Sequence, residues 1–175
     1  ESTTQSLDRE LVLIGCGKMG EALAGGLIDS GVMSGQQLVC VDVHTERARK
    51  LAKAHGARIR VDDGASARRV WLFAVKPTDV EAAIADHRGA MTSDDLVVSI
   101  AAGVTTDALR AATGSGPELV RAMPNTPALV REGITGIYSP DGRGLDEATA
   151  LFEAVGQVVS LGKEAEFDAL TAISG

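Results

Sequence analysis

Short apolar runs alternate along the chain with stretches in which apolar residues recur every three or four positions. The runs are rich in Val, Leu and Ile, which favours buried strands, and the periodic stretches favour helices with one apolar face. Strands are predicted over 11–14, 38–41, 58–61, 70–75, 96–100, 119–122, 136–138 and 157–161. Helices are predicted over 18–29, 48–55, 77–87, 105–112, 148–155 and 166–175. Such alternation is typical of an α/β fold, with a doubly wound, mainly parallel sheet and helices on both faces.

Local residues predict where some of these helices begin and end. Thr45 is expected to cap the helix over 48–55, and Gly56 to end it, because glycine accepts the left-handed conformation at low cost. Pro77 has no backbone N–H to leave unsatisfied, so it fits the first turn of a helix.

Composition bounds the class of protein. With 175 residues, 45% of them apolar, the chain is long enough to bury a core as one domain. It carries 17 Lys and Arg against 24 Asp and Glu, a net charge of −7, so it lacks the basic surface that nucleic acids require. No apolar run approaches the roughly 20 residues of a membrane span, and the start is polar and acidic, unlike a signal peptide. We therefore expect a cytoplasmic protein with neither a nucleic-acid nor a membrane partner.

The cysteines and histidines predict neither a disulfide framework nor a metal centre. Cys16 and Cys40 both lie within apolar stretches and are expected to be buried free thiols. His44, His55 and His87 are scattered, with no other ligand at metal-binding spacing, so no metal site is expected.

The most informative motif follows the first predicted strand and opens the first predicted helix. It reads Gly15-Cys16-Gly17-Lys18-Met19-Gly20, a G-x-G-x-x-G run. In such a turn the first glycine permits the tight bend, the second lets the backbone approach a pyrophosphate, and the third lets the helix pack on the strand. The amino end of the helix then presents free N–H groups to the phosphates. The expected fold is therefore Rossmann-like with a bound dinucleotide, and a purely structural glycine turn is the alternative.

Asp42 ends the second predicted strand, about 20 residues after Gly20. At that place a carboxylate normally accepts hydrogen bonds from the adenosine ribose, which favours NADH. Arg47 and Arg49 open the following helix and leave NADPH as the alternative, because guanidinium groups suit a 2′-phosphate. A solvated helix face is the plainer interpretation of both arginines.

Further ligand groups are expected after other strands, because open parallel sheets bind ligands beyond the carboxyl ends of their strands. The residues expected to bind the cofactor there are Ala74, Val75, Lys76, Pro77, Ala101, Ala102 and Gly103. A third segment, Met123-Pro124-Asn125-Thr126, is stiffened by its prolines and is expected to face the nicotinamide and substrate with an amide and a hydroxyl. A stiff structural turn is the alternative for this loop, and pairing with an acidic neighbour is the alternative for Lys76.

These segments resemble the pyrroline-5-carboxylate reductase family. The resemblance is carried by four motifs in register along the chain: Ile14-Gly15-Cys16-Gly17-Lys18-Met19-Gly20, Ala74-Val75-Lys76-Pro77, Val97-Val98-Ser99-Ile100-Ala101-Ala102-Gly103-Val104 and Arg121-Ala122-Met123-Pro124-Asn125-Thr126-Pro127-Ala128. The last residues, Ala172-Ile173-Ser174-Gly175, resemble the start of the family's Ser-Gly-rich turn. Where many relatives have Asn-Arg after the second strand, this sequence has Asp42-Val43, which favours NADH over NADPH.

The resemblance implies an NAD(P)H-dependent oxidoreductase that reduces 1-pyrroline-5-carboxylate to L-proline, the last step of proline biosynthesis, by hydride transfer to the C=N carbon. It implies a cofactor domain over 1–163 and, at 164–175, the start of a helical dimerisation domain that is otherwise absent from this chain. The full-length protein would then be a homo-oligomer whose helical domain completes the substrate site. The predicted apolar stripe of Phe167, Leu170 and Ile173, with nothing obvious to pack against, agrees with that expectation.

No catalytic residue is assigned from the sequence. The cofactor carries the hydride chemistry, and the substrate nitrogen must gain a proton, yet no His, Tyr or paired carboxylate stands where a general acid is needed. Two other functions remain open. One is another NAD(P)-dependent reductase of a related Rossmann family, acting on a β-hydroxyacid, prephenate or a deazaflavin, and the other is a non-catalytic dinucleotide-binding module.

Overall fold

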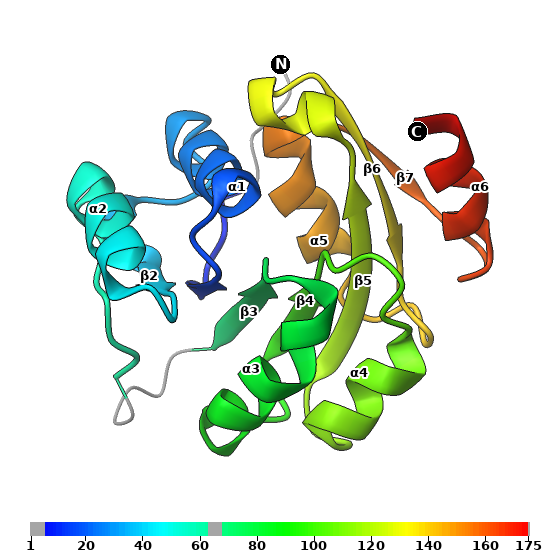
Figure 1. Cartoon of the computed structure of the whole chain (residues 1–175), viewed down its shortest axis with the longest axis horizontal. Coiled ribbons are helices and arrows are strands. Elements are labelled where there is room, and N and C mark those ends of the chain that lie inside the picture. Colours follow the sequence, from blue (N-terminus) through cyan, green and yellow to red (C-terminus); the bar gives the residue numbers. More distant parts are fainter. Residues whose placement is uncertain (1–5, 63–67, 175) are drawn as a thin grey trace.

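The computed structural model describes residues 6–62 and 68–174, which form a seven-stranded sheet between two layers of helices (Figure 1). The strands are β1 (Glu10–Ile14), β2 (Leu38–Val41), β3 (Arg69–Phe73), β4 (Leu96–Ser99), β5 (Glu118–Pro124), β6 (Gly133–Tyr138) and β7 (Gly156–Ser160). The α-helices are α1 (Lys18–Asp29), α2 (Thr45–His55), α3 (Val80–His87), α4 (Thr106–Thr113), α5 (Leu145–Phe152) and α6 (Glu166–Ser174). The predicted α/β architecture is confirmed.

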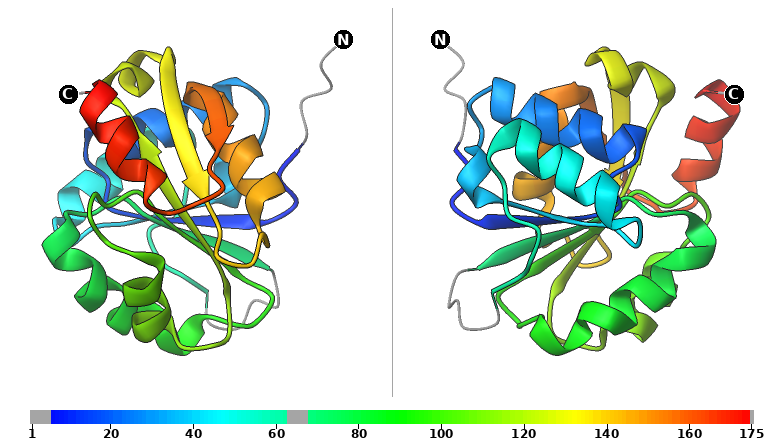
Figure 2. Two further views of the ribbon diagram at one scale, coloured as in Figure 1. Left: turned by 90° about the vertical axis from the view of Figure 1, so that its right-hand side faces the viewer. Right: turned by 60° about the vertical axis from the view of Figure 1, so that its left-hand side comes forward.

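The strand order explains where a ligand can bind. Across the sheet the order is β2-β1-β3-β4-β5-β6-β7, and the first five strands in this order are parallel. β6 then runs antiparallel to β5, and β7 runs parallel to β6. α1, α2 and α5 cover one face of the sheet, and α3 and α4 cover the other (Figure 2). The carboxyl ends of five neighbouring strands therefore meet at one edge.

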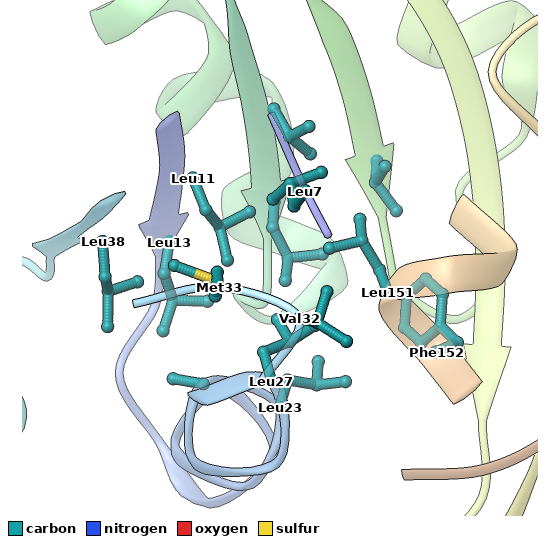
Figure 3. Packing of buried hydrophobic residues seen from close by; sticks show 14 of the residues in the cluster. Leu7, Leu11, Leu13, Leu23, Leu27, Val32, Met33, Leu38, Leu151 and Phe152 are labelled. Atoms are coloured by element: carbon teal, nitrogen blue, oxygen red, sulfur yellow. The ribbon is translucent and has the colours of Figure 1, made fainter. Parts of the chain in front are cut away.

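Each face of the sheet has its own apolar core. On one face, Leu23 and Leu27 of α1 pack near Leu151 and Phe152 of α5 (Figure 3). On the other face, Trp71 of β3 is fully buried in a second cluster that includes residues of α3 and α4. Because strands of a parallel sheet are buried on both faces, they read in the sequence as nearly continuous apolar runs.

Most predicted elements are confirmed, with small changes at their ends. α1 and β2 have the predicted bounds. α2 ends as predicted at Gly56, which adopts a left-handed conformation with φ 68°. Thr45 is not its cap, because the helix begins at Thr45 and His44 holds the capping position without a side-chain hydrogen bond. Helix α4 is capped by Thr105, whose side chain accepts a hydrogen bond from the Ala108 N–H at 3.2 Å.

The prediction of a strand over 58–61 is wrong. Only Arg58 pairs with β2, through an isolated bridge to Val39. Ile59 is 38% exposed, and the Arg58 side chain turns toward Glu10, with Nη2 2.7 Å from Oε2. Ile59 and Val61 alternate with two arginines, which is the pattern that suggested a strand, but Ile59 stays exposed and only Val61 packs partly against the core, so pairing stops after one residue.

Helix α6 packs against the sheet, contrary to the expectation that its apolar face has nothing to pack against. Phe167 is 1% exposed, and Leu170 lies so close to Gly136 of β6 that an added Cβ there would be 2.3 Å from its Cδ1. The side chain of Ile173, the rest of the predicted stripe, lies outside the described residues, as does Gly175 of the Ser-Gly motif. α6 thus lies against β6 on the face of the sheet that α3 and α4 also cover (Figure 1).

Candidate dinucleotide-binding site

The glycine turn joins β1 to α1 at the carboxyl edge of the sheet, and its three glycines meet three different constraints. Gly15 has φ 101°, and a Cβ there would lie 2.3 Å from the carbonyl oxygen of Ala74. A Cβ at Gly20 would lie 2.3 Å from the carbonyl oxygen of Gly15. A Cβ at Gly17, in contrast, would meet no atom within 4 Å among the described residues. The first and third glycines therefore allow tight packing, whereas Gly17 leaves open space in front of the α1 amino end, as a bound pyrophosphate requires.

Asp42, directly after β2, ties the glycine turn to the end of that strand. One of its oxygens accepts a hydrogen bond from the Cys16 backbone N–H at 2.8 Å, and the other accepts one from the His44 N–H, also at 2.8 Å. The carboxylate is therefore held in place before any ligand binds. A carboxylate offers about four acceptor sites, so two remain for ribose hydroxyls.

The two cysteines are free and buried, as predicted. The Cys16 thiol donates to the carbonyl oxygen of Val41, with the sulfur 3.6 Å from that oxygen. A hydrogen bond with the Cys40 thiol, burial and the negative charge of Asp42 together raise the pKa of Cys16. Cys16 therefore stays a neutral thiol and is not a nucleophile in this turn.

A groove of about 490 Å³ runs between α1 and α2, beside the glycine turn. Lys18, Arg47 and Lys50 line it together with one acid, Glu21, so the lining is net positive in a chain whose net charge is −7. Arg49, the other arginine considered for a 2′-phosphate, forms an ion pair with Glu46 at 2.9 Å. Of the two arginines, Arg47 is thus the one whose surroundings suit an anion.

The segments after β3 and β4 reach the same edge of the sheet. After β3, Lys76 is exposed, and no ion pair joins it to an acidic side chain within residues 6–62 and 68–174. After β4, the buried Ser99 hydroxyl accepts a hydrogen bond from the Ala101 N–H at 3.2 Å, which orders the start of the small-residue loop. Ala102 and Gly103 are exposed, so their backbone is accessible to a ligand.

The loop after β5 carries Asn125 and Thr126 at this edge, but the Asn125 amide oxygen is not free to face a ligand. It accepts a hydrogen bond from the Ile134 N–H at 2.9 Å and so joins the loop to the start of β6. Thr126 is exposed and opens a short 3₁₀ helix, Thr126–Val130. Only the amide nitrogen of Asn125 is left for the predicted contact with the nicotinamide or the substrate.

Three residues near this edge were not among the predicted site residues: Thr106, Arg121 and Glu164. Glu164 accepts hydrogen bonds from Thr106 and forms an ion pair with Arg121 at 3.0 Å. Burial alone would raise the pKa of Glu164, but these hydrogen bonds and the positive charge of Arg121 outweigh it and hold the pKa below its usual range. Arg121 was detectable as a charged residue inside an apolar strand, whereas Glu164 is an acid in a polar loop and gave no signal.

Within the described residues, no cluster of three or more His, Cys, Asp or Glu could hold a metal ion. In the same part of the chain, no helix is both long enough and apolar enough to cross a membrane.

A glycine turn at the carboxyl edge of a doubly wound parallel sheet defines the class of Rossmann-type dinucleotide-binding domains, and the predicted fold class is confirmed. The chain belongs to the family described as NADP oxidoreductase, coenzyme F420-dependent, whose model matches residues 10–103.

Among known proteins, the chain is similar to pyrroline-5-carboxylate reductases. It is 36% identical over 174 residues to the enzyme of Mycobacterium leprae, a match that covers 94% of this chain and 58% of that one. The solved structure of the Coxiella burnetii enzyme matches with a TM-score of 0.85 and 28% identity, over 97% of this chain and 64% of that one. The Plasmodium falciparum enzyme, solved with NADP bound, matches with a TM-score of 0.79 and 26% identity, over 97% and 63% of the two chains. The predicted resemblance is thus confirmed, and the chain spans about three fifths of the length of these relatives.

Proposed function

We propose that this chain forms the cofactor-binding part of an NAD(P)H-dependent pyrroline-5-carboxylate reductase, which reduces 1-pyrroline-5-carboxylate to L-proline. The observation that carries the proposal is the glycine turn, with open space at Gly17 in front of the α1 amino end. The similarity to pyrroline-5-carboxylate reductases over most of this chain supports the choice of substrate. A nicotinamide cofactor, when bound, supplies the hydride for the C=N carbon.

Each segment at the carboxyl edge has a proposed part in binding. The N–H groups from Gly17 to Gly20 hold the pyrophosphate, because those of Gly15 and Cys16 already donate to Val41 and Asp42. Asp42 accepts from the adenosine ribose. The segments 74–77 and 101–103, which follow the neighbouring strands β3 and β4, line the cofactor. The loop 123–126 faces the nicotinamide and the substrate, with Thr126 offering a hydroxyl. No proton donor is assigned within the described residues, so the chain's contribution is binding and orientation.

For the cofactor we propose a preference for NADH over NADPH. Asp42 is held at the end of β2 by two hydrogen bonds, so a 2′-phosphate on the ribose would meet a fixed negative charge. The groove with Arg47 and Lys50 supports the opposite preference, because both cations line it beside the glycine turn. The NADP bound to the Plasmodium falciparum enzyme shows that a similar fold accepts the phosphorylated cofactor.

We also propose that the complete gene product is a homo-oligomer whose substrate site is completed by residues outside this chain. The relatives are longer, and this chain covers 58% to 64% of those compared above. Sedimentation of the complete gene product tests this part of the proposal, and a monomer that turns over substrate would contradict it.

The deciding experiment is an assay of the complete gene product with 1-pyrroline-5-carboxylate and either NADH or NADPH. We expect proline formation matched by cofactor oxidation, with a higher kcat/KM for NADH. Binding of a dinucleotide without turnover would instead support the non-catalytic module. No binding of either cofactor would contradict the proposal as a whole.

A further inference from the structure

Glu164, in the loop between β7 and α6, accepts three hydrogen bonds from two other segments of the chain. Its Oε1 accepts from the Thr106 backbone N–H at 2.7 Å and from Arg121 Nη1 at 3.0 Å, and its Oε2 accepts from the Thr106 hydroxyl at 2.9 Å. The side chains of Arg121 and Glu164 are only 7% and 24% exposed. Because the pair is shielded from water, it is more strongly held than a surface ion pair.

The partners of Glu164 adjoin the two segments proposed to flank the nicotinamide. Thr106 begins α4 and closely follows the small-residue loop 101–103. Arg121 lies in β5 on the same face as Met123, and it pairs in register with Ser99 at the end of β4. Met123 and Pro124, the first half of the predicted loop 123–126, are the last two residues of β5 and pair with β6. A single carboxylate thus joins the loop after β4 to the strand that carries the loop after β5.

The segment that follows Glu164 also contacts the Arg121 guanidinium, through Phe167 of α6. Its Cζ lies 4.4 Å from the ring centroid of Phe167, close enough for a cation–π contact. Its Nε is buried and has no hydrogen-bond partner among the described residues. Arg121 therefore depends on Glu164 for its negative partner, and loss of that partner would leave a buried charge uncompensated.

From this geometry we infer that Glu164 is a positioning residue for hydride transfer. By holding Thr106 and Arg121 together, its carboxylate sets the distance between the loop 101–103 and the loop 123–126, and hence the orientation of the nicotinamide between them. This inference rests on the proposed function. It adds a residue from the loop before α6, which the motifs of the sequence did not include.

The test compares kcat with dinucleotide affinity in the complete gene product. In Glu164→Gln the ion pair with Arg121 is lost, so the nicotinamide is held less well and kcat falls about 10- to 100-fold. The Kd for the dinucleotide changes by less than about threefold, because the pyrophosphate and adenosine half is held by the glycine turn and Asp42, far from Glu164 in the sheet. Thr106→Ser, which keeps both donors, retains at least half of the wild-type kcat, whereas Thr106→Val loses the hydroxyl and lowers it.

The matched control is Glu118→Gln. Glu118 lies at the opposite end of the same strand, is 19% exposed and pairs at 3.1 Å with Arg143, which is 60% exposed. The substitution therefore removes a more exposed ion pair of the same strand, away from the site. Its kcat stays within about twofold of wild type. Equal kcat values in the two glutamine variants would overturn the inference, as would a loss of dinucleotide affinity with kcat unchanged.

A second measurement does not depend on activity. Hydrogen exchange in the ligand-free protein reports the Thr106 N–H, for which Glu164 is the acceptor. In Glu164→Ala its exchange becomes at least about tenfold faster, while the Ala108 N–H, which donates to Thr105, keeps its wild-type rate. An unchanged Thr106 rate would overturn the inference.

Failure of the proposed function has a different signature. If the wild-type protein neither binds a dinucleotide nor forms proline, the proposed function is wrong, whatever the exchange rates show. If the wild type is active and Glu164→Gln is equally active, only the positioning role is wrong.

Discussion

Gly15 and Gly17 of the glycine turn lack a side chain for different structural reasons. At Gly15 a side chain would collide with the backbone of Ala74, directly after β3, and would also require a left-handed φ. At Gly17 the backbone is extended, with φ −77°, and the surroundings are open. The first glycine therefore serves the fold, and the second keeps space for a ligand.

Alanine substitutions separate these two roles. We expect Gly15→Ala to lower the free energy of unfolding by about 2 kcal/mol or more, from backbone strain and the clash with Ala74. Gly17→Ala is expected to unfold as the wild type does and to weaken dinucleotide binding about tenfold or more, because its methyl group occupies the space proposed for the pyrophosphate. Urea unfolding and calorimetry measure the two effects. Normal affinity in Gly17→Ala would show that the phosphates bind elsewhere.

Asp42 gives a test of cofactor choice. In Asp42→Ser the fixed negative charge is removed, so we expect the affinity for NADPH to rise relative to NADH by about tenfold, or 1.4 kcal/mol. Calorimetric titration of both cofactors measures the ratio, with Arg47→Gln as the companion variant. If the wild type binds NADPH more tightly and Arg47→Gln abolishes that preference, the groove between α1 and α2 determines the specificity instead.

His87 gives a pH dependence of stability. Its ring lies 5.7 Å from that of Trp71, and burial lowers its pKa, although the nearby Asp86 acts in the opposite direction. The unfolded chain then binds the proton more readily than the folded one, so stability falls as the pH drops below the ordinary histidine pKa of about 6.5. His87→Gln removes this group, so we expect its Tm to fall less than that of the wild type between pH 7 and pH 5. An identical pH profile in the variant would contradict the assignment.

At the scale of elements, the segment from Glu164 through α6 is held by contacts with β5, β6 and α4. Phe167 is buried beneath the helix and lies against the Arg121 guanidinium. Leu170 occupies the space that Gly136 leaves over β6. α6 therefore packs on the sheet, and the domain boundary expected after residue 163 stays a prediction.

Truncation of Phe167 tests whether α6 unfolds with the sheet. If the helix belongs to one cooperative unit, Phe167→Ala lowers the free energy of unfolding by about 3 kcal/mol, from lost burial and the cation–π contact. The exposed neighbour Asp168 gives the control variant Asp168→Ala, for which we expect a change of less than about 0.5 kcal/mol. Urea unfolding measures both. A near-zero effect of Phe167→Ala would mean that α6 detaches before the sheet unfolds.

At the scale of the whole molecule, the parallel order of β2, β1, β3, β4 and β5 brings the glycine turn, Asp42 and the loops after β3, β4 and β5 to one edge. These segments are far apart in the sequence and become neighbours only through the sheet. A ligand that spans the edge contacts several of them at once and therefore stabilises the whole fold.

Thermal unfolding with cofactor tests this consequence. At a free NADH concentration of about 100 times Kd, binding adds about 2.7 kcal/mol to the stability of the folded state, which raises Tm by roughly 5–10 °C. NADPH at the same concentration is expected to raise Tm less. The absence of a shift with either dinucleotide would contradict a binding site at this edge.

The elements that were predicted well are those set by local chemistry. The strand and helix over 38–41 and 18–29 follow from hydrophobic periodicity, and the left-handed end of α2 follows from Gly56. β5 is longer than predicted where Pro124 pairs with Thr135 of β6, and β6 is longer where Gly133 and Ile134 pair with β7. Such pairing depends on the partner strand and leaves little trace in either segment alone.

By itself, the sequence determined the alternation of strands and helices, the glycine turn and the resemblance to pyrroline-5-carboxylate reductases, because each depends on neighbouring residues and on the steric limits of the backbone. Only the tertiary structure decided that 58–61 forms no strand, that α6 packs on β6, and that Glu164 joins Thr106 to Arg121. Those partners lie 58 and 43 positions from Glu164. Contacts between residues so far apart depend on strand order and on the burial of charge, and the local sequence pattern determines neither.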